Sequence, residues 1–562
     1  MSLLGTIQQS SASLQVAQVG LQVVGNNIAN ANTPGYIRQT LQQTSAVAAR
    51  EGNLILGQGV RPLGIVQSID RALAERMIHA QSSLAGSQTL ERAYNQLEEL
   101  VTDLDNTGLN QQFSLFNNAL HELSTQPGDP SLRDFVILQG ETLASQLRRT
   151  HQEALARREL WNDDLQRISE EINRLTARIA RANLEIATIE GGGLIHSDAA
   201  GLRDQRLRDL EELSKYIKIN VQEQESGAVA VFVGGDYLVS NGIHREVDST
   251  YNAKTQGSEI RVVETDSPLQ TDQGTLASTM IARDQIFSDF ISRLDRIASS
   301  LIHAMNDVHS QGQGRRGYRD LVSSVPLDPG APLGQAGFQW PPRNGSFDLQ
   351  LVDDNGNLRS NHTITVRMLG GTGDSTVHSI VNQINAIDGI EAIVGAEGRI
   401  EITTSSPDVS FTFGEDSSGF LSAAGINTFF VGENASDITV HDALVRDSDL
   451  LAISAAGIGA DTDVLTQMVD LVGRPLDYLD GRSIQQTYVD VVAELGQRAS
   501  LQQSETEGLQ NFYATLQGEH LAITGVNIDE ESIRMITYQR AFQASSRVIS
   551  TAVEMLDLLL EI

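Results

Sequence analysis

The two ends of the chain repeat apolar residues at the spacing of a coiled-coil helix. Near the start, the residues that recur every seven positions, or three positions after those, are Ile7, Leu14, Leu21 and Ile28, with Ala17 and Val24. Near the end, the same pattern is formed by Ile528, Met535, Phe542, Ile549 and Leu556, with Tyr538, Ser545, Ala552 and Leu559. A seven-residue repeat is typical of a helix that buries one face against another helix. We therefore predict that both ends are helical and that they pair.

Both terminal helices have predicted boundaries. The first runs into the stretch Asn26-Asn27-Ile28-Ala29-Asn30-Ala31-Asn32-Thr33-Pro34-Gly35-Tyr36. Pro34 disfavours a helical conformation in the residue before it, and Gly35 permits a turn. The second helix has a candidate N-cap at Asn527 or Asp529, and the acidic residues that follow suit the positive end of a helix dipole.

The heptads alone leave two roles open for this pair. It could clasp one monomer together, or it could be an arm that packs among neighbouring copies. Roughly five buried Leu-class residues per helix contribute about 1.5–3 kcal/mol each. Ordering about 60 residues costs about 1–2 kcal/mol per residue. Burial within an isolated pair does not offset this cost, and the comparison favours assembly with other copies.

The interior begins with helices, and its strongest periodicity runs from Leu165 to Ile189. Residues 84–190 are predicted to be helical, with a break at Pro127-Gly128-Asp129-Pro130. Alternating residues with turn signals at Gly234-Gly235 and Asn241-Gly242 predict strands over 194–270. Helical spacing returns over 275–310 and 450–523.

A proline-rich stretch over 322–343 is interpreted as a linker into an inserted domain. Residues 344–430 alternate like a sheet, with a hairpin turn at Asn355-Gly356 and a short helix from Val377 to Ile387. We predict an α+β multidomain fold with a nested layout. Its domains are a terminal helical assembly domain (1–36 and 524–562), a helix-rich core with a strand-rich part at 194–270 (37–322 and 431–523), and a β-rich outer domain (323–430).

The composition of the chain argues against several classes of function. The chain has 562 residues and a net charge of −32, which argues against binding to nucleic acid or to an anionic membrane surface. It has no Cys, which excludes disulfides, cysteine zinc sites and a thiol nucleophile. No apolar run approaches the ~18–20 residues of a membrane span. The first residues lack a basic segment followed by a continuous apolar one, so we expect no cleavable secretory signal.

Catalytic and metal-binding patterns are missing from the sequence. No Gly-Lys dipeptide occurs, so there is no P-loop, and neither His-Glu-x-x-His nor Gly-x-Ser-x-Gly is present. The stretch from Asp353 to Asn357 departs from the calcium-loop pattern and is predicted to be a turn. The histidines, including His303 and His309, are expected in surface or capping roles. We predict no enzyme activity, no metal and no cofactor.

The two ends also resemble a known family. The Asn-rich stretch up to Pro34-Gly35-Tyr36 resembles the N-terminal signature of the axial proteins of the bacterial flagellum, which include rod, hook and hook-associated proteins. The segment Gly525-Val526-Asn527-Ile528-Asp529-Glu530-Glu531, followed by Tyr538-Gln539-Arg540-Ala541-Phe542, is similar to the C-terminal segment of that family. Its opening is most similar to the hook-associated members that join hook to filament.

Interior segments resemble the same members. Asp204-Gln205-Arg206 is similar to an Asp-x-Arg-Asp helix, although Leu207 stands at the second Asp position. Two further segments are similar to those members. One is a helix end with Asn306, His309 and Gly312, and the other is Phe429-Phe430-Val431-Gly432, where the chain returns to the core domain. The likeness covers most of the chain outside about 324–428, and that insert resembles outer domains that vary within the family.

The resemblance implies a structural subunit at the hook–filament junction, placed outside the cell and exported by the flagellar type III apparatus. The implied partners are further copies in a ring, the hook protein, the next hook-associated protein and an export chaperone that holds the C-terminal helix. The alternatives are a hook or distal-rod subunit, and a secreted enzyme or adhesin with Asp353, Asp374 and His378 as its only candidate residues. The predicted assembly interface comprises Ile7, Leu14, Leu21, Val24, Ile28, Asn30, Pro34, Gly35, Tyr36, Ile528, Met535, Phe542, Ile549 and Leu556.

Overall fold

A computed structural model describes residues 3–51, 54–101, 108–190, 199–253, 257–371 and 373–560. Contacts between residues divide the chain into two compact units. Unit 1 comprises Met1–Ala93, Leu160–Arg283 and Ser500–Ile562, and unit 2 comprises Tyr94–Glu159 and Asp284–Ala499. Long helices combined with several small sheets confirm the predicted α+β multidomain class. The predicted division into three nested domains remains a prediction.

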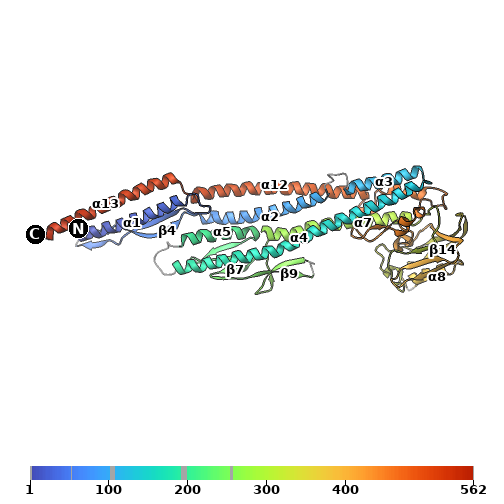
Figure 1. Ribbon diagram of the computed structural model, residues 1–562. Helices are drawn as coiled ribbons and strands as arrows, with labels where there is room; N and C mark the ends of the chain where they lie inside the picture. Colours follow the sequence, from blue (N-terminus) through green and yellow to red (C-terminus); the bar gives the residue numbers. More distant parts are fainter. Residues whose placement is uncertain are drawn as a thin grey trace. The chain divides into compact units, whose positions relative to one another are not determined.

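In unit 1 the first and last helices lie side by side, as the heptads predicted. Helix α1 (Leu3–Ala29) and helix α13 (Ile528–Leu560) run antiparallel, with the N- and C-terminal ends at the same end of the pair (Figure 1). The other side of α1 contacts β1 (Gln39–Ser45) and β4 (Val60–Gln67), which pair with each other in antiparallel register. Between these two strands lies the short hairpin of β2 (Ala49–Glu51) and β3 (Leu54–Leu56).

The rest of unit 1 packs helices onto two small antiparallel sheets. One sheet holds β5 (Asn220–Glu223), β6 (Val229–Val233), β7 (Asp236–Ser240) and β8 (Ile243–His244), and the other holds β9 (Val247–Asn252), β10 (Gly257–Val262) and β11 (Ser267–Pro268). The turns predicted at Gly234-Gly235 and Asn241-Gly242 join β6 to β7 and β7 to β8. Helices α5 (Ala200–Tyr216) and α6 (Gly274–Ile281) contribute to the same core.

The apolar seam predicted between Leu165 and Ile189 supplies much of that core. Leu165, Ile172 and Ile179 are buried against residues of the sheets, because a residue every three or four positions returns to the same helix face. They belong to α4 (Pro130–Glu190), a single helix of 61 residues. The predicted glycine stop of this helix, Gly191-Gly192-Gly193, lies outside the described residues.

The predicted break near Pro127 separates α3 (Leu109–Thr125) from α4. Pro130 is the first residue of α4, where its missing N–H has no helical acceptor to lose. The carboxylate of Asp129 accepts from the backbone N–H of Ser131 at 2.8 Å and caps the helix start. Helix α2 (Arg71–Val101) begins next to Asp70, and Asp70 accepts from the N–H of Leu73.

The prediction that 450–523 is helical is only partly confirmed. Helix α12 (Ile484–Thr524) is long, but α11 (Asp463–Leu471) is separated from it by turns. The turns follow from Gly473, Pro475 and Gly481, since proline disfavours helix in the residue before it and Gly481 has a φ of +75°.

The inserted part of unit 2 contains the predicted strands and helix. One sheet has the order β14 (Leu358–Val366), β13 (Gly345–Asp353), β17 (Val409–Gly414), and another has β12 (Asp320–Val322), β16 (Ile400–Thr404), β15 (Ile390–Val394). The turn at Asn355-Gly356 joins β13 to β14 as predicted, and Gly356 has a φ of +80°. Helix α8 (Val377–Asn385) begins at the capping box of Thr376.

The proline-rich stretch is not a free linker. The backbone N–H of Leu327 donates to Gly398 O and that of Leu333 donates to Ser375 O, each at 2.9 Å. Both leucines are buried, and β12 at the start of the stretch is paired with β16. Proline content alone could not distinguish this extended, hydrogen-bonded segment from a spacer.

The buried side chain of Asn306 attaches the segment that follows the insert to the end of α7 (Ser288–His309). Asn306 Oδ1 accepts from the N–H of Phe429 at 3.0 Å and of Phe430 at 2.9 Å, and its Nδ2 donates to Phe430 O at 2.8 Å. Phe430 begins the short strand β18 (Phe430–Val431), which pairs with β19 (Thr439–Val440). The amide of Asn306 therefore satisfies backbone groups of this segment in the way that a neighbouring strand would.

His309 is not in the surface or capping role that the sequence suggested. It is fully buried, its Nδ1 lies 2.8 Å from Asn427 O, and its Nε2 accepts from the N–H of Ala452 at 3.0 Å. Burial lowers the pKa of His309 to about 4, so the ring is neutral and Nδ1 carries the proton that it donates. The remaining short elements of the chain are η1 (Ala282–Phe287, a π-helical turn), η2 (Leu333–Gln335), α9 (Phe420–Ala424), α10 (Asp442–Arg446), η3 (Ser448–Leu450) and η4 (Asp477–Leu479).

Candidate assembly site at the paired terminal helices

On α13, the predicted seam is the face that meets α1. Met535, Phe542, Ile549 and Leu556 are half-buried, and the positions three further on carry the half-buried Tyr538 and Ser545 and the buried Ala552. Ile528 lies outside this seam with 49% of its surface exposed, because it is the first helical residue and Glu531 takes the inward position. Leu559, the last position predicted for this seam, is 61% exposed and does not face α1. The seam is therefore mostly apolar, with Ser545 as a polar exception, and it is polar where the helix begins.

On α1, the buried face is wider than the predicted heptad row. Ile7, Leu14, Leu21 and Ile28 are half-buried. The fully buried residues are Ser10, Val16, Ala17, Gly20, Val23, Val24 and Asn27. The face is broadened because α1 contacts α13 on one side and β1 and β4 on another. A single periodic row cannot describe a helix with two partners.

Gly20 lets the two helices approach each other closely. A Cβ atom at this position would lie 2.5–2.7 Å from ring atoms of Tyr538 on α13. That separation is shorter than any real carbon–carbon contact, so the ring or the helix would have to move. On the same helix, Gly25 has open space around it.

This difference gives a prediction with an internal control. Gly20→Ala should weaken the α1–α13 pair and lower the free energy of unfolding of unit 1 by about 1–3 kcal/mol, the usual cost of overpacking. Gly25→Ala makes the same chemical change and should stabilise α1 by about 0.5–1 kcal/mol through helix propensity. Urea unfolding of both variants measures the difference, and equal effects at the two positions would show that the close approach is absent.

A cluster of five residues, here named the clasp, ties the end of α1 to the start of α13. It consists of Asn27, Tyr36, Arg38, Gln39 and Glu531. Asn27 is 1% exposed, and its Nδ2 donates to Glu531 Oε2 at 2.9 Å and to Gln39 O at 2.8 Å. Its Oδ1 accepts from Tyr36 Oη at 2.8 Å and from Gln39 N at 3.0 Å. Both donors and both acceptor sites of the amide are thus used.

The carboxylate in the clasp is completely buried. Glu531 is 0% exposed, and Arg38 Nε lies 3.2 Å from its Oε1, an ion-pair distance without the alignment of a hydrogen bond. A buried carboxylate is stable only with a counter-charge and hydrogen-bond donors, which Arg38 and Asn27 supply. Burial, together with the nearby carboxylates Asp204 and Glu531, raises the pKa of Tyr36 to about 12, so its hydroxyl stays protonated.

The remaining predicted residues of the Asn-rich stretch form the turn after α1. Asn30 is half-buried, and its Nδ2 donates to Asn26 O at 2.9 Å, a local contact. Pro34 and Gly35 are exposed, and Gly35 has a φ of +73°. The carbonyl of Gly35 accepts from Arg208 Nη1 at 3.1 Å, which attaches the turn to α5.

Sequence reasoning did not select Gly20, Asn27, Arg38, Gln39 or Glu531 as interface residues. Asn27 stood within an Asn-rich run, and Glu531 was assigned only to the helix dipole. Asn27 and Glu531 are 504 positions apart, so local spacing carries no signal that they meet. A search for polar residues at inward positions of the two heptads would have found Glu531, which lies seven positions before Tyr538.

Asp204 on α5 supports the segment that follows the clasp, and it makes the stability of unit 1 depend on pH. Its carboxylate is 4% exposed and accepts from the side chain of Gln67 and the N–H of Ile37. Burial raises the pKa of Asp204 from 3.8 to about 6, although these hydrogen bonds and Arg208 act in the opposite direction. Between these two pH values the folded chain keeps a proton that the unfolded chain has lost, so stability falls as pH rises.

Asp204→Asn should therefore flatten the pH dependence of unit 1 between pH 4 and 6. At pH 7 the variant should be more stable than the parent by up to about 3 kcal/mol, since each pKa unit corresponds to about 1.36 kcal/mol. Asp248→Asn, on an exposed strand position of the same unit, is the matched control. Urea midpoints measured from pH 4 to 7 test this, and parallel curves for parent and Asp204→Asn would contradict it.

The candidate residues for an enzyme or adhesin are engaged in turns or lie in solvent. Asp353 accepts from the N–H groups of Asn355 and Asn357, each at 2.9 Å, and Asp374 accepts from Leu369 and Gly370. These hydrogen bonds lower the pKa of both carboxyls. His378 is exposed on α8. Within the described ranges, no three His, Asp or Glu side chains are placed to hold a metal ion, and no helix is long and apolar enough for a membrane span.

Comparison with known proteins finds one class of relatives. Residues 94–320 match the model of the flagellar hook-associated protein FlgK helical domain. Flagellar hook-associated protein 1 of Escherichia coli is 22% identical over 99% of both chains, and that of Bacillus subtilis is 24% identical over 98% of this chain and 96% of the other. Over nearly its whole length, the chain is therefore similar to flagellar hook-associated protein 1. Hook-associated proteins of this family are structural proteins of the flagellum and not enzymes.

Further matches agree with this family. The flagellar hook junction protein FlgK from Burkholderia pseudomallei shares the fold, with a TM-score of 0.50 and 14% identity over 79% of this chain and 99% of that chain. Residues 9–36 match a model of flagella basal body rod proteins, and residues 517–562 match the C-terminal model of the basal body rod FlgEFG proteins. These terminal matches coincide with α1 and α13. The chain is thus a component of the bacterial flagellum whose ends are shared with other axial proteins.

Proposed function

We propose that the chain is a structural subunit of the hook–filament junction and that it polymerises through its paired terminal helices. The observation that carries this is the outer surface of α13. After pairing with α1, its exposed large apolar residues are Ile528, Ile533, Ile536, Val548, Val553, Met555, Leu558 and Leu559. An exposed apolar surface of this extent is typical of an interaction site. Neighbouring subunits would cover it.

The predicted interface residues then fall into two groups. Met535, Phe542, Ile549 and Leu556 face α1 and hold the two helices as one unit. Ile528 and the other exposed apolar residues face outward, where they would meet adjacent copies in a ring. The turn with Pro34 and Gly35 is exposed as well and lies at the root of the pair.

The proposal includes the partners of such a subunit. A junction subunit contacts the hook protein on one side and the next hook-associated protein on the other. Before assembly, an export chaperone would cover the apolar surface of α13, in the way that a groove binds an amphipathic helix. Export through the flagellar type III apparatus, without a cleavable signal, would place the chain outside the cell.

Charges on the outer face of α13 should separate assembly from folding. Ile533→Glu with Ile536→Glu places two carboxylates at positions that are 66% and 49% exposed, so the free energy of unfolding should change by less than about 0.5 kcal/mol per site. When this variant is expressed in a strain whose own gene for the protein has been deleted, the cells should build hooks but no filaments. Gln539→Glu with Gln543→Glu adds the same charge at exposed polar positions and should still support filaments. Normal filaments with the isoleucine variant would contradict the proposal.

A hook or distal-rod subunit is the second candidate, favoured by the matches of both chain ends to rod-protein models. Deletion of the gene distinguishes the two. Cells that build hooks but no filaments support the junction role, whereas loss of the hook itself supports the alternative. Electron microscopy of isolated hook–basal bodies gives the answer directly.

A further inference from the structure

A groove lies in unit 1 beside the root of the terminal helix pair. It has a volume of about 380 Å³ and lies between the start of α2, α5 and the strands β5 and β6. Aliphatic residues form much of its wall, and Ile69, Leu207 and Val221 keep part of their surface exposed there. Leu207 is the residue that stands in place of an Asp in the resembled Asp-x-Arg-Asp helix, so this wall is more apolar here.

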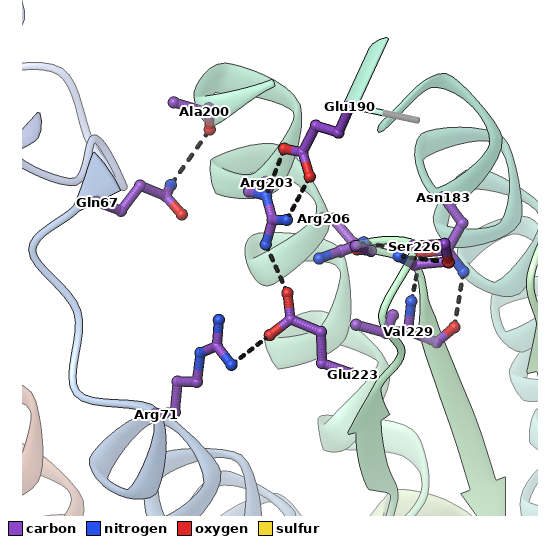
Figure 2. Close-up of polar contacts among 12 residues, drawn as sticks. Gln67, Arg71, Asn183, Glu190, Ala200, Arg203, Arg206, Glu223, Ser226 and Val229 are labelled. Carbon is purple, nitrogen blue, oxygen red and sulfur yellow. Dashed lines mark hydrogen bonds and ion pairs between the residues drawn. The ribbon is translucent and has the colours of Figure 1, made fainter. Parts of the chain in front are cut away.

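Three arginines share the groove with these aliphatic residues. Arg71 pairs with Glu223 at 2.7 Å, and Arg203 pairs with Glu190 and Glu223, each at 2.7 Å (Figure 2). Arg71 and Arg203 are therefore neutralised by carboxylates on neighbouring segments.

Arg206 differs from the other two. It is only 5% exposed, and its Nη1 donates to Asn183 Oδ1 at 2.9 Å and to Gly227 O at 2.8 Å, both neutral acceptors (Figure 2). No carboxylate among the described residues lies within ion-pair distance of it. Glu75 also lines the groove, but its side chain is 60% exposed and contacts His79. Burial, together with the neighbouring Arg203, lowers the pKa of Arg206 to about 10, although Glu223 and Glu190 act in the opposite direction from beyond ion-pair distance.

The complementary surface is present on the far end of α13. Glu554 and Leu558 are four residues apart, so they stand on one face of the helix, one turn from each other. Met555 and Leu559 extend the apolar part of this surface. Met555, Leu558 and Leu559 are all more than half exposed, and Glu554 is exposed too. This segment, residues 554–559, is here named the tip.

The tip cannot reach the groove of its own chain. Leu558 is 27 positions beyond Glu531, and a helix rises about 1.5 Å per residue, so the tip lies roughly 40 Å from the clasp. The groove lies next to the clasp, because Ile37 lines it and follows Tyr36 directly. An occupant with the chemistry of the tip must therefore come from a second copy of the chain.

We propose that the tip of one subunit docks in the groove of the next, with Glu554 facing Arg206 and Leu558 against Leu207. This inference rests on the proposed polymerisation and adds the two surfaces that meet. The contact joins different surfaces on the two copies, so it repeats head to tail and generates a ring or helical array. Glu554 supplies a direct ion-pair partner, which no described residue of its own chain gives to Arg206.

Cysteine cross-linking tests the contact, since the chain has no cysteine of its own. Two copies, one carrying Leu558→Cys and the other Leu207→Cys, are expressed together in cells that lack the native copy. Mild oxidation of their isolated flagella should give a disulfide-linked dimer that neither variant gives alone. Pairing Leu558→Cys with Thr265→Cys, an exposed position elsewhere in unit 1, should give none.

Charge is tested separately without altering the groove. Glu554→Gln, added to the Leu558→Cys copy, removes one charged hydrogen bond and should lower the cross-linked fraction at limiting oxidant by roughly tenfold. If filaments form but the Leu207→Cys pair gives no dimer, or no more than the Thr265→Cys pair, this docking is wrong and the junction role stands. If the unsubstituted chain restores no filaments, the proposed function itself fails.

Discussion

Replacing Asn27 by Leu should separate the terminal helices where they are joined. The substitution keeps the size of the side chain but removes all four hydrogen bonds of the amide. The N–H and carbonyl of Gln39, the hydroxyl of Tyr36 and the carboxylate of Glu531 lose a partner in a buried site. Each unsatisfied group costs about 1–3 kcal/mol. We expect the free energy of unfolding of unit 1 to fall by at least about 3 kcal/mol.

Hydrogen exchange of the amides in α1 and α13, together with urea unfolding, measures this loss. Asn30→Leu is the matched control, because Asn30 is in the same stretch and its Nδ2 donates only within the turn, to Asn26. Its effect should stay near 0.5 kcal/mol. Retained protection of both helices in Asn27→Leu would show that the clasp does not hold them.

A double substitution tests the hydrogen bond between Asn27 and Glu531 itself. Asn27→Asp places a second carboxylate beside Glu531 and should be at least as damaging as Asn27→Leu. Adding Glu531→Gln should restore part of the loss, since a glutamine at 531 can donate to the new carboxylate. Recovery in the double variant, and not in Asn27→Leu with Glu531→Gln, is the expected signature of this contact.

The second large effect is expected in unit 2, at Asn306. Asn306→Leu would leave the N–H groups of Phe429 and Phe430 and the carbonyl of Phe430 without their partner. Both phenylalanines are fully buried, so water cannot replace these bonds. We expect the free energy of unfolding of unit 2 to fall by at least about 3 kcal/mol, because each of the three groups costs about 1–3 kcal/mol.

The two tryptophans allow each unit to be followed by itself. Trp161 in unit 1 lies under the guanidinium of Arg92, and Trp340 in unit 2 stacks on His303. In a Trp161→Phe background, the fluorescence of Trp340 reports on unit 2 alone. Asn385→Leu is the control, because Asn385 also donates to and accepts from one backbone, that of Ala392, but is itself exposed to solvent. Equal destabilisation by both substitutions would rule out the anchoring role of Asn306.

The sequence predicted best where one local pattern determined the structure. The seam of α13 and the long seam of α4 each follow a 3.6-residue period, and the turns at Gly234-Gly235 and Asn355-Gly356 follow from glycine's access to positive φ. α1 was predicted less well, because contacts with both α13 and the β1–β4 pair widen its buried face. A prediction from one periodic row of residues assumes that the helix packs against a single partner.

Apart from Glu531, the polar residues of the site could not be predicted, for a different reason. Asn27 meets Glu531, and Asn306 meets Phe430, only after the chain has folded back over long distances. A buried Asn and a surface Asn have the same local sequence character. The same holds for His309, whose burial depends on Asn427 and Ala452 and not on its neighbours in α7.

The clasp also sets an order of events during synthesis. Glu531 is made 504 residues after Asn27, and at about 5–20 residues per second this takes roughly 25–100 seconds. Throughout that interval the apolar face of α1 has no α13 to cover it. Contacts of such long sequence separation make folding slow. The pairing of the ends is therefore a late step, which keeps the chain from closing on itself while it is still being made.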